Sequence, residues 1–405
     1  MGALVEEALA PGSEADCAAI VREAAAEGQA LEIRGGGSRS GLGHPIRNAR
    51  TLSMARLSGV TLYEPEAMTL VAAAGTPLAE IETLLAGQNQ RLPFEPTDLR
   101  ALYDTGATEP TLGGVVATGA SGPRRIQAGA CRDSLIGVRF VNGRGEAIKS
   151  GGRVMKDVTG YDLVKLTAGA HGTLGVITQV AFKLLPRPEK TATLLLSRLS
   201  DEAAVAAMSA ALGSPFDVTG AAHFPAGPDG APVTMIRLEG FEKSVDYRAE
   251  KLREQLRPLL PSGAEAAIEA GAETTEADWR RVRDAEGFAG RPGAVWRITV
   301  KPSDGPGLLA ELRAALPVEA AFYDWGGGLI WLLTADPAGG DAGGAAVRAA
   351  TDTRGGKATL LRASEETRAR VSVFHPQNPV LGRLAAGLKS KFDPAGVLNP
   401  GRMGA

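Results

Sequence analysis

The sequence predicts a protein of the α+β class that holds two or three domains. Its 405 residues are enough for that number, because a domain commonly takes about 100 to 200 residues. Up to about residue 188, candidate strands alternate with short candidate helices around glycine-rich loops. Beyond Pro186-Arg187-Pro188, alanine-rich helical stretches and further strands replace these loops. We therefore expect a domain boundary near residue 188.

The elements of the first part follow from capping residues and short apolar runs. Ser13, followed by acidic residues, predicts the start of an amphipathic helix that Gly28 would end. A strand over 30–33 then leads into a glycine-rich loop. Asp162 is expected to cap a later helix. The remaining predicted elements are strands at 69–73, 137–141 and 176–185 and a helix at 78–85.

The second part is predicted from longer periodic stretches. Its predicted elements are helices near 201–212, 246–259 and 380–391 and strands at 295–300 and 329–333. The stretch 335–346 is rich in Gly, Ala, Pro and Asp, which predicts a surface loop. Residues 392–402 contain too many helix and strand breakers for regular structure, so we expect an irregular tail there.

Composition excludes several classes of function. With 44 basic and 46 acidic residues the formal charge is −2, which leaves no electrostatic basis for binding nucleic acid. Cys17 and Cys131 stand alone and match no zinc or iron–sulfur spacing. No apolar run of 18 residues and no basic leader occur. We expect a cytoplasmic protein without direct membrane insertion, peripheral to a membrane only through partners.

Glycine is in excess, and its main cluster predicts an anion site. The chain has 52 glycines, about 13% against an average near 7%. Gly35, Gly36 and Gly37 follow a strand, and consecutive glycines let backbone N–H groups turn toward an anion. A Walker loop would need Gly-Lys-Ser/Thr after Gly41, but Leu42-Gly43 follows. A Rossmann turn would need a helix where His44-Pro45 stands, so neither reading fits.

Two more segments share this glycine-rich character. They are residues 111–125 and 167–177, both mostly small and uncharged. If the three segments lined one cleft, a long dinucleotide would lie against their backbone. The alternative is three unrelated turns in a glycine-rich protein.

At these residues the sequence resembles a known family. The residues that carry the likeness are, in order, Ile33 to Ser38, Gly113-Gly114, Ser121 to Arg125, Val154 to Leu163, Gly172 to Ile177, Asp324 to Gly327 and Asp393 to Arg402. They resemble the FAD-binding domain shared by vanillyl-alcohol oxidase, p-cresol methylhydroxylase (PCMH) and the flavin subunits of 2-hydroxyacid dehydrogenases. Within that family the chain is similar to the FAD-binding E subunits of bacterial glycolate oxidase (glycolate dehydrogenase) complexes.

The resemblance implies a fold and a domain plan. It implies a PCMH-type FAD-binding domain of two α/β subdomains at 1–188 and a cap domain on an antiparallel sheet at 189–360. A C-terminal segment, 361–405, would return to the FAD-binding domain. Relatives that attach FAD covalently place a histidine where this chain has Ser38, so the resemblance implies noncovalent FAD, and His44 is not expected to be an attachment site.

The resemblance also implies which residues contact the cofactor. Around the pyrophosphate it places Gly35, Gly36, Gly37, Ser38, Arg39, Ser40 and Gly41. Along the ribityl chain and flavin it places Thr108, Leu112, Gly113, Gly114, Thr118 and Ser121. Along the adenosine half it places Gly172, Gly175, Val176 and Ile177. No metal ligand is implied.

Three residues are candidates for positions next to the flavin. Lys156, or Arg153 beside it, would donate to the pyrimidine edge and stabilise negative charge there, unless it is a solvated surface base. Asn399 matches a position that approaches the isoalloxazine in relatives. His375 would either face the flavin or pack a turn.

One absence shapes the functional hypothesis. Similar flavin dehydrogenases carry an H-x-G-D-G-N-x-H metal and substrate motif in the cap, and this chain lacks it. The resemblance therefore implies two partners, a catalytic flavin subunit with that motif and an iron–sulfur subunit, for oxidation of a small 2-hydroxyacid. The alternatives are a self-sufficient FAD-dependent alcohol or hydroxyacid oxidoreductase and a redox-silent scaffold subunit.

Overall fold

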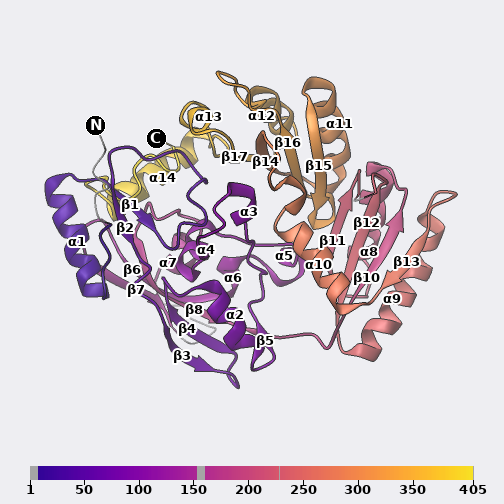
Figure 1. Ribbon diagram of the computed structural model, residues 1–405, viewed down its shortest axis with the longest axis horizontal. Helices are drawn as coiled ribbons and strands as arrows, with labels where there is room; N and C mark the ends of the chain where they lie inside the picture. The colour runs from indigo at the N-terminus through magenta and orange to yellow at the C-terminus, as the bar shows by residue number, and fades with distance from the viewer. Residues whose placement is uncertain (1–7, 153–159, 228, 405) are drawn as a thin grey trace.

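The computed structural model describes residues 8–152, 160–227 and 229–404. Two antiparallel sheets, each covered by helices, stand side by side in Figure 1. The sheet at left contains strands from residues 60–183, and the sheet at right contains strands from residues 190–362. The mixture of helices and antiparallel sheets confirms the α+β class. Lys156 and Arg153 lie outside the described residues.

An N-terminal layer precedes the first sheet. Helix α1 (Glu14–Glu27) begins as predicted, with the Ser13 hydroxyl accepting from the Asp16 N–H at 3.1 Å, and it ends at Gly28 with φ of 66°. Strands β1 (Leu31–Arg34) and β2 (Arg50–Ser53) pair in parallel. The first glycine loop connects these two strands. The apolar side of α1 packs on both of them.

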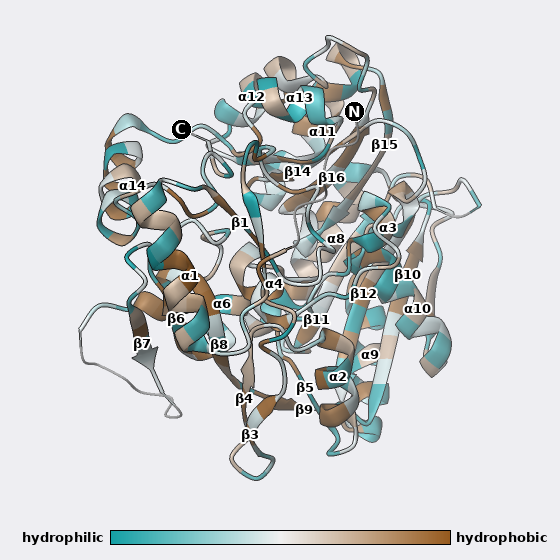
Figure 2. Ribbon diagram, turned by 60° about the vertical axis from the view of Figure 1, so that its left-hand side comes forward, coloured by the Kyte–Doolittle hydropathy of each residue, from teal (hydrophilic) through white to brown (hydrophobic). Residues whose placement is uncertain are grey.

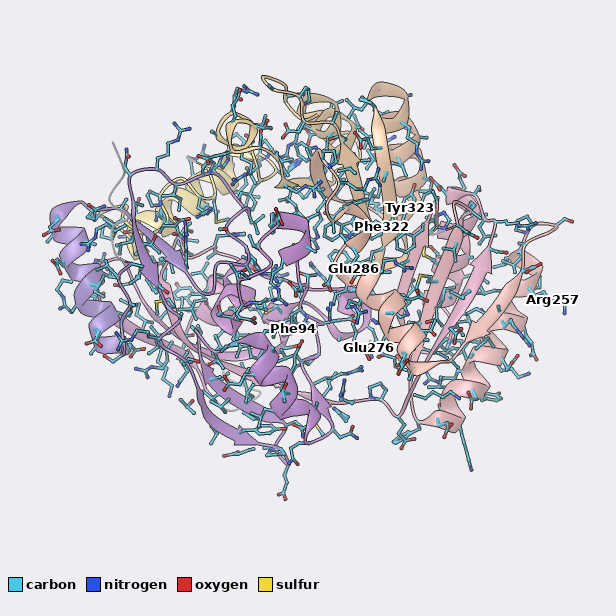
Figure 3. The ribbon with its side chains drawn as sticks, in the orientation of Figure 1. Phe94, Arg257, Glu276, Glu286, Phe322 and Tyr323 are labelled. Carbon is cyan, nitrogen blue, oxygen red and sulfur yellow. The ribbon has the colours of Figure 1, made fainter. Side chains whose placement is uncertain are left out.

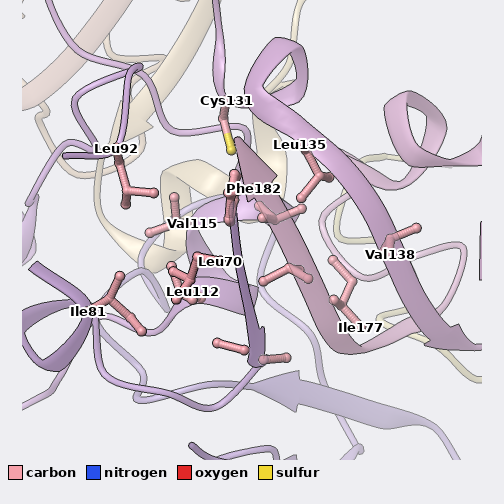
Figure 4. Close-up of a cluster of buried hydrophobic side chains, with 14 of the residues drawn as sticks. Leu70, Ile81, Leu92, Leu112, Val115, Cys131, Leu135, Val138, Ile177 and Phe182 are labelled. Carbon is pink, nitrogen blue, oxygen red and sulfur yellow. The ribbon is translucent and has the colours of Figure 1, made fainter. Parts of the chain in front are cut away.

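The five-stranded sheet has the order β3-β4-β8-β6-β7, with all neighbours antiparallel. Its strands are β3 (Val60–Glu64), β4 (Thr69–Ala73), β6 (Leu135–Val141), β7 (Ala147–Gly151) and β8 (Val176–Lys183). Figure 2 shows the apolar character of β8, and Figure 4 shows the buried cluster built on it. Leu112 and Val115 of α4 belong to the same cluster as Phe182 of β8, which anchors the glycine-rich start of α4 to the sheet.

Short elements connect the strands of this half. The helices are α2 (Leu78–Ala86), α3 (Arg100–Tyr103), α4 (Leu112–Thr118), α5 (Arg125–Ala128), α6 (Cys131–Ser134) and α7 (Leu163–Thr167). Asp162 caps α7 as predicted, with its carboxylate accepting from the Lys165 N–H at 2.9 Å. The strand predicted over 176–185 is shorter than expected. It stops at Lys183, and Leu185–Pro186 forms β9, which pairs with β5 (Gln90–Arg91) instead.

The eight-stranded sheet has the order β13-β10-β12-β11-β15-β16-β14-β17. Its strands are β10 (Lys190–Ser197), β11 (Val218–Phe224), β12 (Val233–Gly240), β13 (Ala266–Glu269), β14 (Ala294–Thr299), β15 (Val318–Asp324), β16 (Leu329–Thr334) and β17 (Lys357–Arg362). Helices α8 (Asp201–Leu212), α9 (Glu242–Leu256), α11 (Gly305–Ala315) and α12 (Gly344–Asp352) cover one face. The other face, with α10 (Ala272–Arg283), packs against Leu42, Leu99 and Leu102 of the first half.

Single turns of 3₁₀ helix complete this half at Arg257–Leu259, Glu286–Phe288, Pro302–Asp304 and Trp325–Gly327. Two predicted boundaries are wrong here. The helix expected at 246–259 runs from Glu242 to Leu256, because Pro258 interrupts it. The loop expected at 335–346 ends at α12, which begins at Gly344 because Asp341 accepts from the Ala345 N–H at 2.8 Å.

The C-terminal segment packs on the N-terminal half. Helices α13 (Glu365–Arg370) and α14 (Pro379–Phe392) lead into the tail. Leu398 bridges to Leu31 in parallel, so the irregular tail lies beside β1. Two backbone bonds fix it, from Leu31 N to the Val397 carbonyl at 2.8 Å and from Asn399 N to the Leu31 carbonyl at 3.0 Å. Within the described part of the chain, every helix is too short or too polar to span a lipid bilayer.

Candidate functional site

The first glycine loop is pressed against residues 108–111, and only glycine fits there. A Cβ on Gly35 would lie 2.1 Å from the Thr111 hydroxyl oxygen, and one on Gly36 would lie 1.8 Å from the Glu109 carbonyl oxygen. Gly37 has φ of 86°, a conformation that favours glycine. Within the described residues the N–H groups of Gly36, Gly37 and Ser38 donate to no protein acceptor. The loop therefore presents free backbone donors, as an anion site requires.

The second glycine segment is the start of α4. Thr111 caps this helix, its hydroxyl accepting from the Gly114 N–H at 3.4 Å. Gly113 sits against the sheet, since a Cβ there would lie 2.7 Å from the Ala74 Cβ. Gly114 is different, because a Cβ there would meet only the Thr111 hydroxyl oxygen at 3.3 Å. Gly114 thus leaves open space where most residues would place a side chain.

The third segment is fixed by Asn399. The Asn399 side-chain oxygen accepts from the Ile33 N–H at 2.8 Å, and its Nδ2 donates to the His171 carbonyl at 2.7 Å. This amide joins β1, the tail and the third segment. A Cβ on Gly172 would lie 2.7 Å from Asn399 Nδ2, which explains the glycine. The Asn399 amide thus bonds to backbone through both its oxygen and its nitrogen, so the structure supports a positioning role for it.

The three segments meet around one pocket, here called the glycine pocket. The predicted residues that line it are Gly35, Gly36, Gly37, Ser38, Arg39, Ser40, Gly113, Gly114, Thr118, Gly172, Gly175, Ile177 and Asn399. Its other lining residues are Glu32, Ile33, Arg34, Leu42, Met54, Ala74, Thr111, Ala117, His171 and Arg402. Residues more than 350 positions apart in the sequence thus share one wall.

A second, more open hollow borders the same loop. It is lined by Gly35, Gly36, Gly37 and Ser40 together with hydroxyl-bearing residues that include Thr51, Ser53, Thr105 and Thr108. Thr108 therefore faces this hollow and does not line the glycine pocket. Its hydroxyl donates to the Thr105 carbonyl at 2.7 Å, which shapes the turn under the loop.

Four predicted contact residues line neither hollow. Leu112 and Val176 are fully buried in the hydrophobic cores, and the Ser121 hydroxyl donates to the Gly119 carbonyl at 3.2 Å. A Cβ on Gly41 would lie 2.5 Å from the Tyr103 ring. The side chains at these positions pack within the protein, and their predicted contacts with the cofactor remain a prediction.

Positive charge and a neutral histidine dominate the pocket wall. Burial, followed by the nearby Arg402 and Arg39, lowers the pKa of His171 to about 4, so its imidazole is neutral at physiological pH. Arg39 donates to the backbone carbonyl of Thr97 and forms no ion pair among the described residues. Arg402 pairs with Glu32 at 2.7 Å and donates to the Leu42 carbonyl at 3.1 Å. An arginine and free backbone N–H groups that line one pocket favour a polyanion such as a diphosphate.

His375 is held by contacts to two elements of the second half. Its Nδ1 accepts from the Ala358 N–H at 3.3 Å, and its Nε2 lies 2.9 Å from the Asp352 carboxylate. Arg348 lies 3.1 Å from the same Nδ1 and donates to the Phe374 carbonyl. His375 therefore joins α12 to β17, away from the pocket wall, and the structure favours the turn-packing alternative.

Sequence reasoning missed several lining residues. Thr111 had a local signal, because a hydroxyl residue before a helix start predicts a cap. Met54 had none, since only the folded chain brings it to the glycine-rich segments, whereas His171 lies within the third of those segments. Among the described residues no three His, Cys, Asp or Glu side chains are close enough to hold a metal ion.

Comparison with known proteins agrees with this geometry. A family described as "FAD binding domain" matches residues 6–151. The chain is 35% identical over 385 residues to the glycolate oxidase subunit GlcE of Escherichia coli (strain K12), covering 95% of each chain. It is 44% identical over 85 residues to the glycolate oxidase subunit GlcD of Bacillus subtilis (strain 168), which is 21% of this chain and 18% of the relative.

The fold also matches solved structures. The chain superposes on 4-ethylphenol oxidase from Gulosibacter chungangensis with a TM-score of 0.71 at 15% identity, covering 97% of this chain and 88% of that one. It superposes on alkyldihydroxyacetonephosphate synthase with a TM-score of 0.69 at 18% identity, covering 96% and 76%. At these identities the likeness establishes a shared fold.

Proposed function

Because the chain belongs to the family of FAD-linked oxidoreductases that includes the glycolate oxidase subunit GlcE, we propose that it is the noncovalent FAD subunit of a complex that oxidises glycolate or a related 2-hydroxyacid. The observation that carries this proposal is the glycine pocket. Three glycine-rich segments close on one space that has free backbone donors among the described residues, the Arg39 side chain and no bulky side chain at Gly114.

The lining residues fit FAD in chemistry. We assign the pyrophosphate to the Gly36 to Ser38 N–H groups and to Arg39, and the flavin half to Gly114 and Thr118. His171 stays neutral in this environment and presents no added positive charge. Bound FAD supplies hydride and electron transfer chemistry. The protein's part is to fix the cofactor against rigid backbone and to exclude water from it.

Noncovalent attachment is supported by the histidines near the loop. His44 uses both ring nitrogens: Nδ1 donates to the Arg368 carbonyl at 2.7 Å, and Nε2 accepts from the Val373 N–H at 3.3 Å. Its ring is therefore committed to the C-terminal segment. His171 packs on Phe374 with ring centroids 4.9 Å apart. Ser38, on the loop itself, offers only a buried hydroxyl.

We infer partner subunits because this chain has no cysteine set for an iron–sulfur cluster and no H-x-G-D-G-N-x-H motif. Cys17 and Cys131 are buried singly, and burial raises the pKa of Cys17 to about 12, so neither thiol is suited to ligate a cluster. We assign the iron–sulfur centre to a partner subunit, and the metal-dependent hydroxyacid site to a partner flavin subunit. The similarity to GlcD, itself a glycolate oxidase subunit by name, supports a complex of related flavoproteins.

The test compares the isolated chain with its complex. The chain is purified alone and with the co-expressed partners, and glycolate is added to each without oxygen while the flavin absorbance is followed. We expect the flavin of the isolated chain to stay oxidised and that of the complex to bleach. Bleaching of the isolated chain would instead show a self-sufficient enzyme.

A further inference from the structure

The C-terminal helix α14 carries a row of exposed apolar side chains. Val380, Leu381, Leu384 and Leu388 are 54%, 56%, 62% and 40% exposed. Their spacing of three and four positions places them on one face of the helix. None of the residues of α14, all of which the structure describes, is buried, and Figure 2 shows the helix at the edge of the molecule. These four side chains, here called the apolar row, are therefore accessible to a partner.

The apolar faces of the large sheet and of a comparable helix are covered. Phe322 and Tyr323 of β15, labelled in Figure 3, belong to opposite faces of the eight-stranded sheet and are 2% and 0% exposed. Helix α9, which is one residue longer than α14, buries four residues along its apolar side. Single exposed apolar residues are normal, but a contiguous apolar patch marks an interaction site. The apolar row of α14 therefore indicates a contact outside its own chain.

The rest of the chain holds α14 by its last turn. Lys389 Nζ donates to the Thr173 carbonyl at 2.8 Å, and the Phe392 ring packs on Phe140 with ring centroids 6.0 Å apart. Arg383, the only polar side chain in the earlier turns, makes no hydrogen bond or ion pair among the described residues. Because a helix of this length is marginal in water by itself, its earlier turns require packing to be stable. We expect a binding partner to supply that packing.

The charges of α14 argue for a protein partner and against a lipid surface. The helix contains Arg383, Lys389 and Lys391 and no acidic residue. Lys389 lies 2.5 Å from the Asp393 carboxylate, so two cations are left without an ion pair among the described residues. Segments that bind anionic lipids carry clusters of about four to eight Lys or Arg. Two cations are too few for such a surface, but they suit a protein groove with a few carboxylates at its rim.

The spacing of the leucines is typical of helices that bind in a groove. Leu381, Leu384 and Leu388 stand at positions i, i+3 and i+7. Amphipathic helices that lie in an apolar groove of a partner protein use anchor residues with this spacing. Arg383 and Lys391 each lie three positions after a member of the apolar row, so their charges border it. The sequence of α14 thus fits a groove that is apolar at its floor and acidic at its rim.

We propose that α14 is the helix by which this chain docks on the partner flavin subunit, with the apolar row in an apolar groove rimmed by carboxylates. This inference rests on the proposed function, which supplies the partner subunits. Of the two proposed partners, the flavin subunit is the one that the similarity to GlcD supports. Docking removes the apolar row from water, packs the earlier turns of α14, and pairs Arg383 and Lys391 with acids.

The test uses the full-length chain, carrying an affinity tag and co-expressed with both proposed partner subunits. The subunits that co-purify are quantified by mass spectrometry, and the Kd for the flavin partner is obtained by dilution of the purified complex in mass photometry. Leu384→Ser and Leu388→Ser are each expected to raise this Kd about tenfold or more, as loss of a buried leucine does. Arg383→Glu, which reverses a charge beside the apolar row, should raise the Kd as well and reduce its dependence on salt.

The matched control is Leu259→Ser in the second half of the protein. Leu259 is 55% exposed, like the leucines of the apolar row, and this variant should assemble as the wild type does. The isolated Leu384→Ser and Leu388→Ser chains should keep the wild-type melting temperature and FAD content, because both side chains are exposed when the chain is alone. A lower melting temperature in these two variants would show that the row stabilises its own chain, and would overturn the docking helix.

A photo-crosslinking residue, p-benzoylphenylalanine in place of Leu384, identifies what covers the apolar row. A cross-link to the flavin partner supports the proposal. A cross-link to the iron–sulfur subunit or to a second copy of this chain would overturn the choice of partner. Binding of the wild-type chain to phosphatidylglycerol vesicles, lost in the two serine variants, would assign the row to a lipid surface instead.

The FAD content of every variant is measured, so the cofactor role is tested separately from docking. Serine variants that hold FAD and recover the flavin partner with an unchanged Kd would overturn the docking helix alone. A wild-type chain that holds FAD but recovers neither partner would contradict both the docking helix and the complex of the proposed function.

Discussion

Replacing Gly114 by leucine should empty the glycine pocket of FAD while leaving the protein folded. Gly114 occupies the third position of α4, lines the pocket and has φ in the helical range. A Cβ there meets only the Thr111 hydroxyl oxygen, at 3.3 Å. The leucine side chain must therefore extend into the space that we assign to the cofactor.

The substitution is expected to change the free energy of FAD binding more than the free energy of unfolding. Leucine is favoured over glycine in a helix by roughly 0.8 kcal/mol, and any weakening of the Thr111 cap costs about 1 kcal/mol, so the two nearly cancel. In the complex with FAD, the added carbons overpack the pocket, which costs about 1–3 kcal/mol or more. That penalty corresponds to a rise in Kd of roughly 5- to 200-fold. Gly114→Ala, which adds one carbon, should bind FAD more nearly as the wild type does.

The assay compares FAD content, from the ratio of flavin to protein absorbance, with the melting temperature of FAD-free protein. The control is Gly387→Leu on α14, another helical glycine, where a Cβ would meet nothing within 4 Å. Gly387→Leu should keep the wild-type FAD content and the wild-type melting temperature. Gly36 is a poorer probe, because a side chain there collides with the Glu109 carbonyl even without cofactor. If Gly114→Leu retained full FAD with an unchanged Kd, the assignment of the pocket would be wrong.

Three further predictions follow from single contacts. Asn399→Ala should destabilise the protein by roughly 2–4 kcal/mol in urea unfolding and weaken FAD binding, because it leaves the Ile33 N–H and the His171 carbonyl unpaired; equal stability would contradict the positioning role. His375→Ala should lower the melting temperature but leave FAD content and the flavin spectrum unchanged, and an altered spectrum would place it at the flavin after all. Burial alone would raise the pKa of Glu95, but Arg237 and Arg124 outweigh burial and lower this pKa to about 2, below the ordinary 4.5. The ionised Glu95 carboxylate therefore contributes about 3 kcal/mol to the free energy of unfolding above pH 4.5, and this contribution is lost as the pH falls toward 2. Glu95→Gln should flatten that part of the stability curve, and a wild-type slope in this variant would refute the pairing.

Local features of the fold were predictable because their causes are local. Ser13 and Gly28 bound α1 through contacts within a few residues, and Asp162 caps α7 in the same way. The strand expected over 176–185 was wrong at its end, because β5 pairs with Leu185–Pro186 and draws that part of the chain away from the five-stranded sheet. Local propensity holds no information about such a partner.

The candidate site was likewise predictable only where its causes are local. Glycine clustering indicated which segments form the pocket, because close backbone approach requires glycine wherever it occurs. It did not indicate Arg402 or the orientation of Asn399, which depend on contacts between residues 228 to 366 positions apart.

The visible absorption spectrum of the purified chain, before and after acid precipitation, tests the central claim most directly. The account predicts a flavin spectrum whose chromophore is released wholly into the supernatant and is identified there as FAD. A protein that takes up no FAD even on reconstitution would contradict the assignment of the glycine pocket. Flavin that stayed in the precipitate would contradict noncovalent attachment.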